Sequence, residues 1–208
     1  MKLYGTPTSP YVRMARIMVL EKQLEARVEV LEARTRVPDS PYYAINPSGR
    51  VPYLICDDGT GLEDSGLICA YLDHLDGAPA FDPPAFDPTS GTIGLDAHRL
   101  ETMARSMLDG LAVWGREMMR PEAGRSATII AHEIARSQRM ADLWEREIAH
   151  PWMQGPFNMA QLTLICALQL EIRNPVFNWR PGRPKLAAWA DALATRPSLA
   201  ATRPQQDC

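Results

Sequence analysis

The sequence predicts an α/β domain followed by an all-helical domain. In the first third of the chain, short strand-like runs and amphipathic helical patterns follow one another. A proline-rich segment, residues 78–90, then interrupts every periodic pattern, and beyond it the apolar period is helical only. We therefore expect domains at residues 1–77 and 91–208, joined by this linker.

The first domain begins with a strand, a helix and a second strand. "KLY" is a short strand candidate. Ser9 and Pro10 are favoured at a helix N-cap and first turn, so a helix is expected from about Pro10 to Lys22. "ARVEVLE" alternates Val28 and Val30 with charged residues, which predicts a strand with one buried face.

Two more strands and a helix complete the predicted order βαβ, connection, ββα. The strands are expected at residues 51–56 and 61–63, joined by a tight turn with hairpin chemistry at "DDG". Asp64 or Ser65 then caps a helix that ends at Gly77.

The second domain is predicted to be built on two long amphipathic helices. Two stripes recur at helical spacing: Ile93, Ala97, Leu100, Ala104, Met107, Leu111, Trp114 and Met118 in the first, and Ile130, Ile134, Ser137, Ala141, Trp144 and Ile148 in the second. Helices with such seams pack at the small crossing angles of helical bundles.

A third helix has a detailed start signal, "FNMAQL" at 157–162. Asn158 is the expected N-cap, Gln161 closes a capping box, and Phe157 and Leu162 are spaced for a hydrophobic staple. The helix should continue through "LTLICALQLEI" as a buried element. A last helix is expected after Pro184.

Composition excludes several classes of function. The 208 residues carry a net charge of −3 and no basic stripe, which argues against a nucleic-acid partner. No apolar run is long enough for a membrane span, and no signal peptide is evident, so a cytoplasmic protein is expected. The four cysteines have neither disulfide nor metal-ligand spacing, and no metal site is predicted.

Several motifs together resemble the bacterial glutathione S-transferases, in particular a subgroup with serine at the active site. They are "SPYVRMARI", "NPSGRVPYL", "EDSGLICAYLD", the proline linker and "FNMAQLTLICAL". Each is short, but their order and spacing are specific. The resemblance implies a thioredoxin-like N-terminal domain, a helical C-terminal domain, glutathione as cosubstrate, a homodimer and a role in detoxification.

The resemblance also implies a set of glutathione-binding residues. The Val51–Pro52 bond is expected to be cis, leaving the backbone N–H and C=O of Val51 to pair with the extended glutathione backbone. Asp64 and Ser65 are assigned to the acidic-plus-serine pair that holds the γ-glutamyl end, although neighbouring Glu63 leaves the register open. Arg50 is placed to meet the glycyl carboxylate, or else is simply a solvated surface cation.

Ser9 is the predicted catalytic residue. The reactive species is the glutathione thiolate, whereas a free thiol has a pKa of about 8.5. A hydroxyl donor at a helix N-terminus stabilises a thiolate by hydrogen bond and dipole together. Ser9 is therefore expected to donate to the sulfur, with Thr8 as the alternative donor.

Three functions remain open from the sequence. The leading one is transfer of glutathione to an apolar electrophile, held by side chains of the helical domain near Met103 and Met107. The second is glutathione-dependent peroxide reduction or deglutathionylation at the same site. The third is a glutathione-binding or regulatory protein without turnover.

Overall fold

A computed structural model of the chain describes residues 1–81, 93–174 and 176–205. They fall into two units, Met1–Asp82 and Pro83–Cys208. Residues 82–90 of the predicted linker, and Cys208, lie outside the described residues.

The first unit is built on a four-stranded mixed sheet. Its strands are β1 (Lys2–Gly5), β2 (Glu29–Glu32), β3 (Tyr53–Ile55) and β4 (Gly61–Glu63), in the spatial order β2-β1-β3-β4. Strand β1 is parallel to β2 and antiparallel to β3, and β3 is antiparallel to β4. With its helices, the unit has the order βαβαββα, so the predicted thioredoxin-like domain is confirmed.

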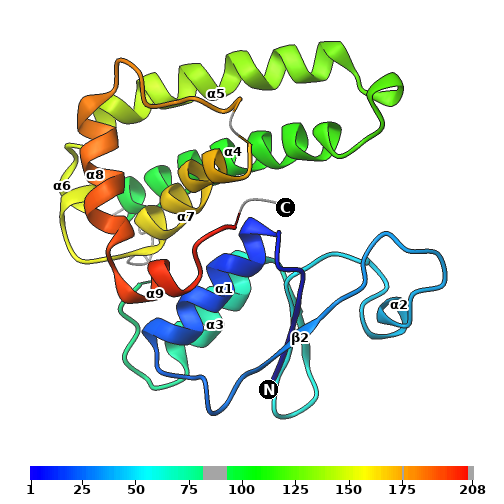
Figure 1. Cartoon of the computed structure of the whole chain (residues 1–208). Coiled ribbons are helices and arrows are strands. Elements are labelled where there is room, and N and C mark those ends of the chain that lie inside the picture. Colours follow the sequence, from blue (N-terminus) through cyan, green and yellow to red (C-terminus); the bar gives the residue numbers. More distant parts are fainter. Residues whose placement is uncertain (82–92, 175, 206–208) are drawn as a thin grey trace. The chain divides into compact units, whose positions relative to one another are not determined.

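Helices lie on both sides of this sheet. α1 (Pro10–Glu21) and α3 (Ser65–His74) lie side by side on one face, and α2 (Tyr42–Ile45) lies beyond the other (Figure 1). The register pairs Leu3 with Leu54, and both are fully buried. The next pair along β1 points to the opposite face because side chains alternate in a strand. There the Tyr4 ring contacts Tyr42 of α2, at 5.9 Å between centroids.

Two sequence-based expectations for this unit need correction. α2 was not predicted, because a four-residue helix is too short to show a period. The second strand was expected to bury one face, but Val30 is 48% exposed while Val28 is 3% exposed. β2 is an edge strand with a neighbouring strand on one side, which leaves Val30 exposed.

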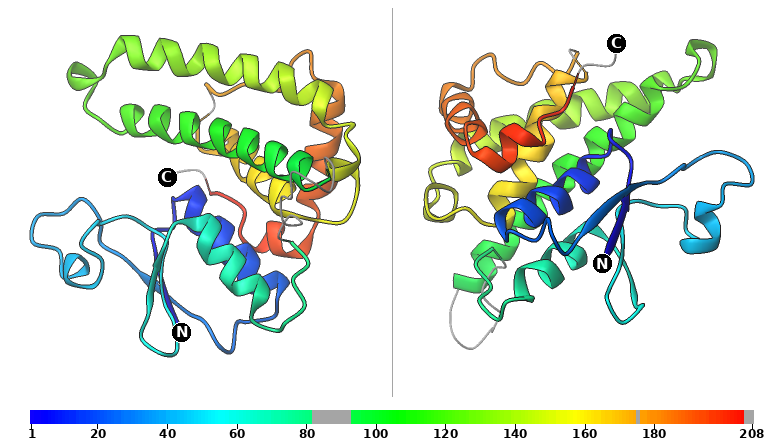
Figure 2. Two further views of the ribbon diagram at one scale, coloured as in Figure 1. Left: turned by 180° about the vertical axis from the view of Figure 1, so that it is seen from behind. Right: turned by 60° about the horizontal axis from the view of Figure 1, so that its bottom comes forward.

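The second unit contains α-helices α4 to α9 and two short 3-10 helices, η1 and η2. Their bounds are α4 (Ile93–Met118), η1 (Glu122–Gly124), α5 (Ala127–Glu147), α6 (Pro151–Gln154), α7 (Met159–Leu168), η2 (Gln169–Ile172), α8 (Pro184–Ala194) and α9 (Pro197–Ala201). α4 packs against both α5 and α7, and Figure 2 shows the two long helices running side by side. α6 and α9 were not predicted.

The predicted stripes form much of the core of this unit. From α4, the buried members are Ala97, Leu100, Ala104, Met107, Leu111 and Trp114; from the second stripe they are Ser137, Ala141, Trp144 and Ile148. Every residue of α7 is buried, as expected for a helix with few polar breaks.

The start of α7 differs from the predicted capping box. The Asn158 side chain accepts from the N–H of Gln161 at 3.2 Å, so the cap is confirmed. The Gln161 side chain, however, donates through Nε2 to the carbonyls of Trp152, Gly155 and Pro156 instead of reaching back to the N-cap. A glutamine is suited to this role because its amide is a donor, which the carboxylate of a usual capping box is not.

Candidate functional site

The sheet register brings three predicted segments to the same end of the first unit. Tyr4 of β1 pairs with Tyr53 of β3, and Tyr53 pairs with Glu63 of β4. Because β3 runs antiparallel to its two neighbours, the chain leaves β1 and β4 where it enters β3. The loop after β1, which contains Ser9, therefore leaves the same edge as the segments containing Val51 and Asp64.

Ser9 lies at the N-terminus of α1. Its backbone is extended, with φ −77° and ψ 122°, and its Oγ accepts from the N–H of Val12 at 3.3 Å. The hydroxyl therefore uses a lone pair for the cap and keeps its own proton to donate. Ser9 is half-buried, and its position at the start of the helix places the hydroxyl at the positive end of the helix dipole. The predicted cap is confirmed.

The loop before β3 is held by Glu63 and by three side chains that were not predicted from the sequence. The hydroxyl of Tyr42 donates to the C=O of Arg50 at 2.5 Å, and Asn46 donates to the same oxygen at 3.1 Å. On the other side of the residue, Ser48 Oγ accepts the N–H of Arg50 at 3.1 Å and donates to Glu63 at 2.9 Å. The signal was present in "NPSGR", because Asn and Ser commonly bond to backbone groups within turns.

These contacts orient the peptide plane between Arg50 and Val51. In a trans peptide the C=O and the following N–H point in opposite directions. Because the Arg50 C=O points toward Tyr42 and Asn46, the N–H of Val51 points away from them. Neither backbone polar group of Val51 bonds to any residue that the structure describes. The expected cis Val51–Pro52 bond is confirmed, and Pro52 is buried.

Asp64 has the most unusual backbone of the site. Its φ is 80°, a region that non-glycine residues adopt at a cost of about 1–3 kcal/mol. Its Oδ1 accepts from the N–H groups of Gly66 at 2.7 Å and Leu67 at 3.2 Å, so Asp64 is the N-cap of α3. Its Oδ2 makes no hydrogen bond within the described chain, and the side chain is exposed. Backbone strain of this kind is concentrated at functional sites.

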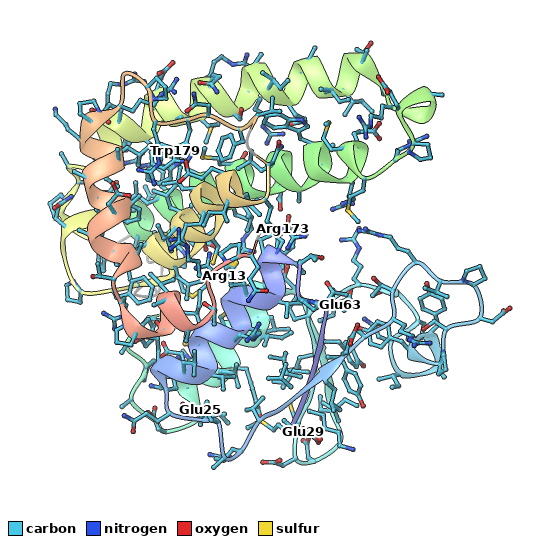
Figure 3. All side chains as sticks on the ribbon, in the orientation of Figure 1. Arg13, Glu25, Glu29, Glu63, Arg173 and Trp179 are labelled. Carbon is cyan, nitrogen blue, oxygen red and sulfur yellow. The ribbon has the colours of Figure 1, made fainter. Side chains whose placement is uncertain are left out.

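Glu63 and Asp64 make different local contacts. Glu63 ends β4 and its carboxylate bonds to Ser48, whereas Asp64 caps the helix and Ser65 is the first helical residue, 2% exposed. Figure 3 labels Glu63.

The remaining predicted residues are placed less specifically. The guanidinium of Arg50 is exposed and has no ion pair within the described chain. Thr8 is exposed in the turn before Ser9. In α4, Met107 is a core residue at 1% exposure, and Met103 is half-buried beside Arg99.

Comparison with known proteins identifies the family. Residues 3–80 match the family model described as the glutathione S-transferase N-terminal domain. An uncharacterised GST-like protein of Escherichia coli K12, YibF, is 30% identical over 206 residues, covering 98% of each chain. The chain belongs to the glutathione S-transferase family. Its match to YibF extends through both structural units.

Solved structures of related glutathione S-transferases include complexes with glutathione. One from Methylobacillus flagellatus KT with bound glutathione has a TM-score of 0.83 at 29% identity, covering 98% of both chains. A family member from Pseudomonas fluorescens Pf-5, also with bound glutathione, has a TM-score of 0.83 at 28% identity and the same coverage. The predicted glutathione transferase fold is thus confirmed.

No helix among the described residues is both long and apolar enough to cross a membrane.

Proposed function

We propose that the protein is a transferase that ionises the glutathione thiol through Ser9 and directs the thiolate at an apolar electrophile. In this reaction the thiol releases its proton to solvent, sulfur forms a bond to the electrophilic carbon, and the leaving group departs with its electron pair. The observation that supports it best is the placement of the Ser9 hydroxyl. It caps α1 with a lone pair, and its proton remains available at the positive end of the helix.

The rest of glutathione is proposed to bind along the same end of the sheet. The N–H and C=O of Val51 pair with the cysteinyl backbone as an added strand does, with Pro52 fixing the turn. At the γ-glutamyl end, Asp64 Oδ2 accepts from the ammonium, and Ser65 at the start of α3 binds the carboxylate. Arg50 pairs with the glycyl carboxylate.

The role of Ser9 in ionisation has a measurable size. A shift of two units in the thiol pKa corresponds to about 2.7 kcal/mol of differential stabilisation. Hydrogen bonds to charged groups contribute about 1.5–3 kcal/mol, and a helix terminus adds about 0.3–1 kcal/mol. The two together are sufficient for such a shift.

Ultraviolet titration of bound glutathione tests this function. Ser9→Ala should raise the pKa of the bound thiol toward its free value and lower turnover at neutral pH, with about 1 kcal/mol lost from the free energy of unfolding as a missing cap. Thr8→Ala is the matched comparison and should leave the titration unchanged. An unchanged thiolate fraction in Ser9→Ala, with a changed one in Thr8→Ala, would transfer the role to Thr8.

Substrate panels separate the alternative activities. Turnover of hydroperoxides or mixed disulfides without turnover of aryl halides would replace conjugation by reduction at the same site. Tight glutathione binding without any turnover would indicate a regulatory protein. We propose that the protein catalyses conjugation and acts as a homodimer in the cytoplasm. Its domains are proposed to span residues 1–77 and 91–208. Light scattering checks the oligomeric state.

A further inference from the structure

The hydroxyl of Ser48 links two of the segments that the proposed site uses. It accepts the N–H of Arg50, two residues on, and donates to Oε1 of Glu63, fifteen residues on. Glu63 directly precedes Asp64 in the chain. A single side chain therefore connects the loop containing Arg50 and Val51 to the turn from β4 into α3.

Different contacts hold the backbone C=O and the backbone N–H of Arg50. Its C=O is fixed by Tyr42 and Asn46, which are 4% and 2% exposed and belong to the folded core of the α2 region. Among the described residues its N–H is fixed through Ser48 alone, whose bond to Glu63 is exposed. The contact with α2 therefore sets the orientation of the peptide plane. The contact with Glu63 adds to the β3–β4 pairing, which places Tyr53 opposite Glu63, and so reinforces the spacing of the loop from the start of α3.

We propose that Ser48 and Glu63 form a positioning clasp that fixes the separation between Arg50–Val51 and Asp64–Ser65, and so selects ligands with an anionic group at each end. This inference rests on the proposed glutathione site. Once one end of a ligand is bound at one segment, its other end binds the second segment intramolecularly. The resulting gain in affinity depends on how well the distance between the two segments is maintained. A ligand without the glycyl carboxylate makes no use of Arg50 and gains less from the clasp.

Two ligands and a small set of variants test the clasp. Titration calorimetry measures the dissociation constants of glutathione and glutathione amide, in which a neutral carboxamide replaces the glycyl carboxylate. Ser48→Ala should weaken glutathione about threefold to fivefold, the value of one exposed hydrogen bond to a charged group. For glutathione amide, the change in the logarithm of the dissociation constant should be at most half as large. Ser48→Thr keeps the donor and should stay close to the parent. Glu63→Gln keeps an acceptor but loses its charge, so its affinity should lie between the parent and Ser48→Ala.

The control is Asp58→Ala at the opposite end of the same β3–β4 hairpin. Asp58 accepts the N–H of Thr60 at 2.9 Å, which is the same two-residue turn contact that Ser48 makes with Arg50. Its loss should leave both dissociation constants unchanged. Amide exchange of ligand-free protein gives a second readout: the Arg50 N–H should exchange faster in Ser48→Ala and as in the parent in Asp58→Ala.

Each outcome has a distinct meaning. Equal loss of affinity for both ligands, or unchanged exchange at Arg50, would overturn the clasp while leaving glutathione binding intact. Failure of the parent protein to bind glutathione would overturn the proposed function and the clasp with it. A selective loss for glutathione that Ser48→Thr restores supports the clasp.

Discussion

The buried carboxylate of Asp73 lies 3.2 Å from the ammonium of Lys22, which joins the end of α3 to the end of α1. Asp73 is fully buried and also accepts the N–H groups of Ala80 and Phe81, at 2.8 to 3.1 Å. Lys22 donates in addition to exposed Asp76 and to the C=O of Ala78. The pair therefore anchors the segment that leaves α3 as well as joining two helices.

Asp73→Ala should lower the free energy of unfolding by about 3–5 kcal/mol, because it leaves a nearly buried ammonium and two backbone N–H groups without this acceptor. Urea unfolding measures it. Asp76→Asn is the control: Asp76 pairs with the same Lys22 but is 53% exposed, so its loss should have a much smaller effect. Equal losses of unfolding free energy in the two variants would show that burial does not make the Lys22–Asp73 pair stronger than the Lys22–Asp76 pair.

Glu117 should make stability depend on pH in the second unit. Its Oε2 accepts the N–H of Ser126 at 2.8 Å, and this bond, opposed by burial and aided by Arg120, holds the pKa of Glu117 below its ordinary value. A lowered folded-state pKa contributes stability above the unfolded value, about 4.3, that is lost as the pH falls through the folded value. Parent and Glu117→Gln should thus differ in urea unfolding at pH 7, and by less at pH 3. Exposed Glu122→Gln, in the same turn, should follow the parent at both pH values.

Two glycines of α4 should respond differently to alanine. A Cβ at Gly110 would lie 2.5 Å from Oε2 of buried Glu133, whereas a Cβ at Gly115 meets nothing within 4 Å. Alanine is favoured over glycine in a helix by about 1 kcal/mol, so Gly115→Ala should stabilise the protein by nearly that amount. In Gly110→Ala the new Cβ must displace that carboxylate, the free end of a flexible side chain, so the melting temperature should rise less than in Gly115→Ala. Equal rises in the two variants would contradict the close contact between Gly110 and Glu133.

The sequence predicted the elements whose signals are local. The Ser9 cap, the Asn158 cap and the Asp64 cap each depend on a few neighbouring residues, and all three are confirmed. The cis bond at Val51–Pro52 came from family resemblance instead, because an isolated X–Pro bond is cis in only about 5–6% of cases.

The parts that the sequence did not predict depend on long-range contacts. Gln161 had the spacing of a capping box. The carbonyls that it binds belong to the preceding loop, and the residue spacing does not predict the path of that loop. Val30 had a buried-strand pattern, yet an edge position exposes it. The bond from Ser48 to Glu63 requires the β3–β4 register, which a hydrophobic pattern over three residues does not fix.

Asp64 combines a structural and a proposed binding role that one substitution separates. Its Oδ1 is fully used by the cap of α3, and its Oδ2 is the oxygen proposed to meet the γ-glutamyl ammonium. Asparagine keeps an oxygen for the cap and tolerates positive φ better than most residues. In Asp64→Asn, therefore, the free energy of unfolding should change by less than about 0.5 kcal/mol. At the same time an amide N–H donor replaces Oδ2, the oxygen proposed to accept from the γ-glutamyl ammonium.

Glutathione should consequently bind Asp64→Asn about tenfold more weakly, since hydrogen bonds to charged groups contribute about 1.5–3 kcal/mol. Calorimetry measures the dissociation constant, and urea unfolding checks the cap in the same preparation. Asp58→Asn is the matched change at the far end of the hairpin, where the carboxylate also accepts a backbone N–H, and it should bind glutathione as the parent does. If Asp64→Asn keeps the parent affinity, the strained backbone at this position serves only the helix start, and the γ-glutamyl ammonium must find its acceptor elsewhere.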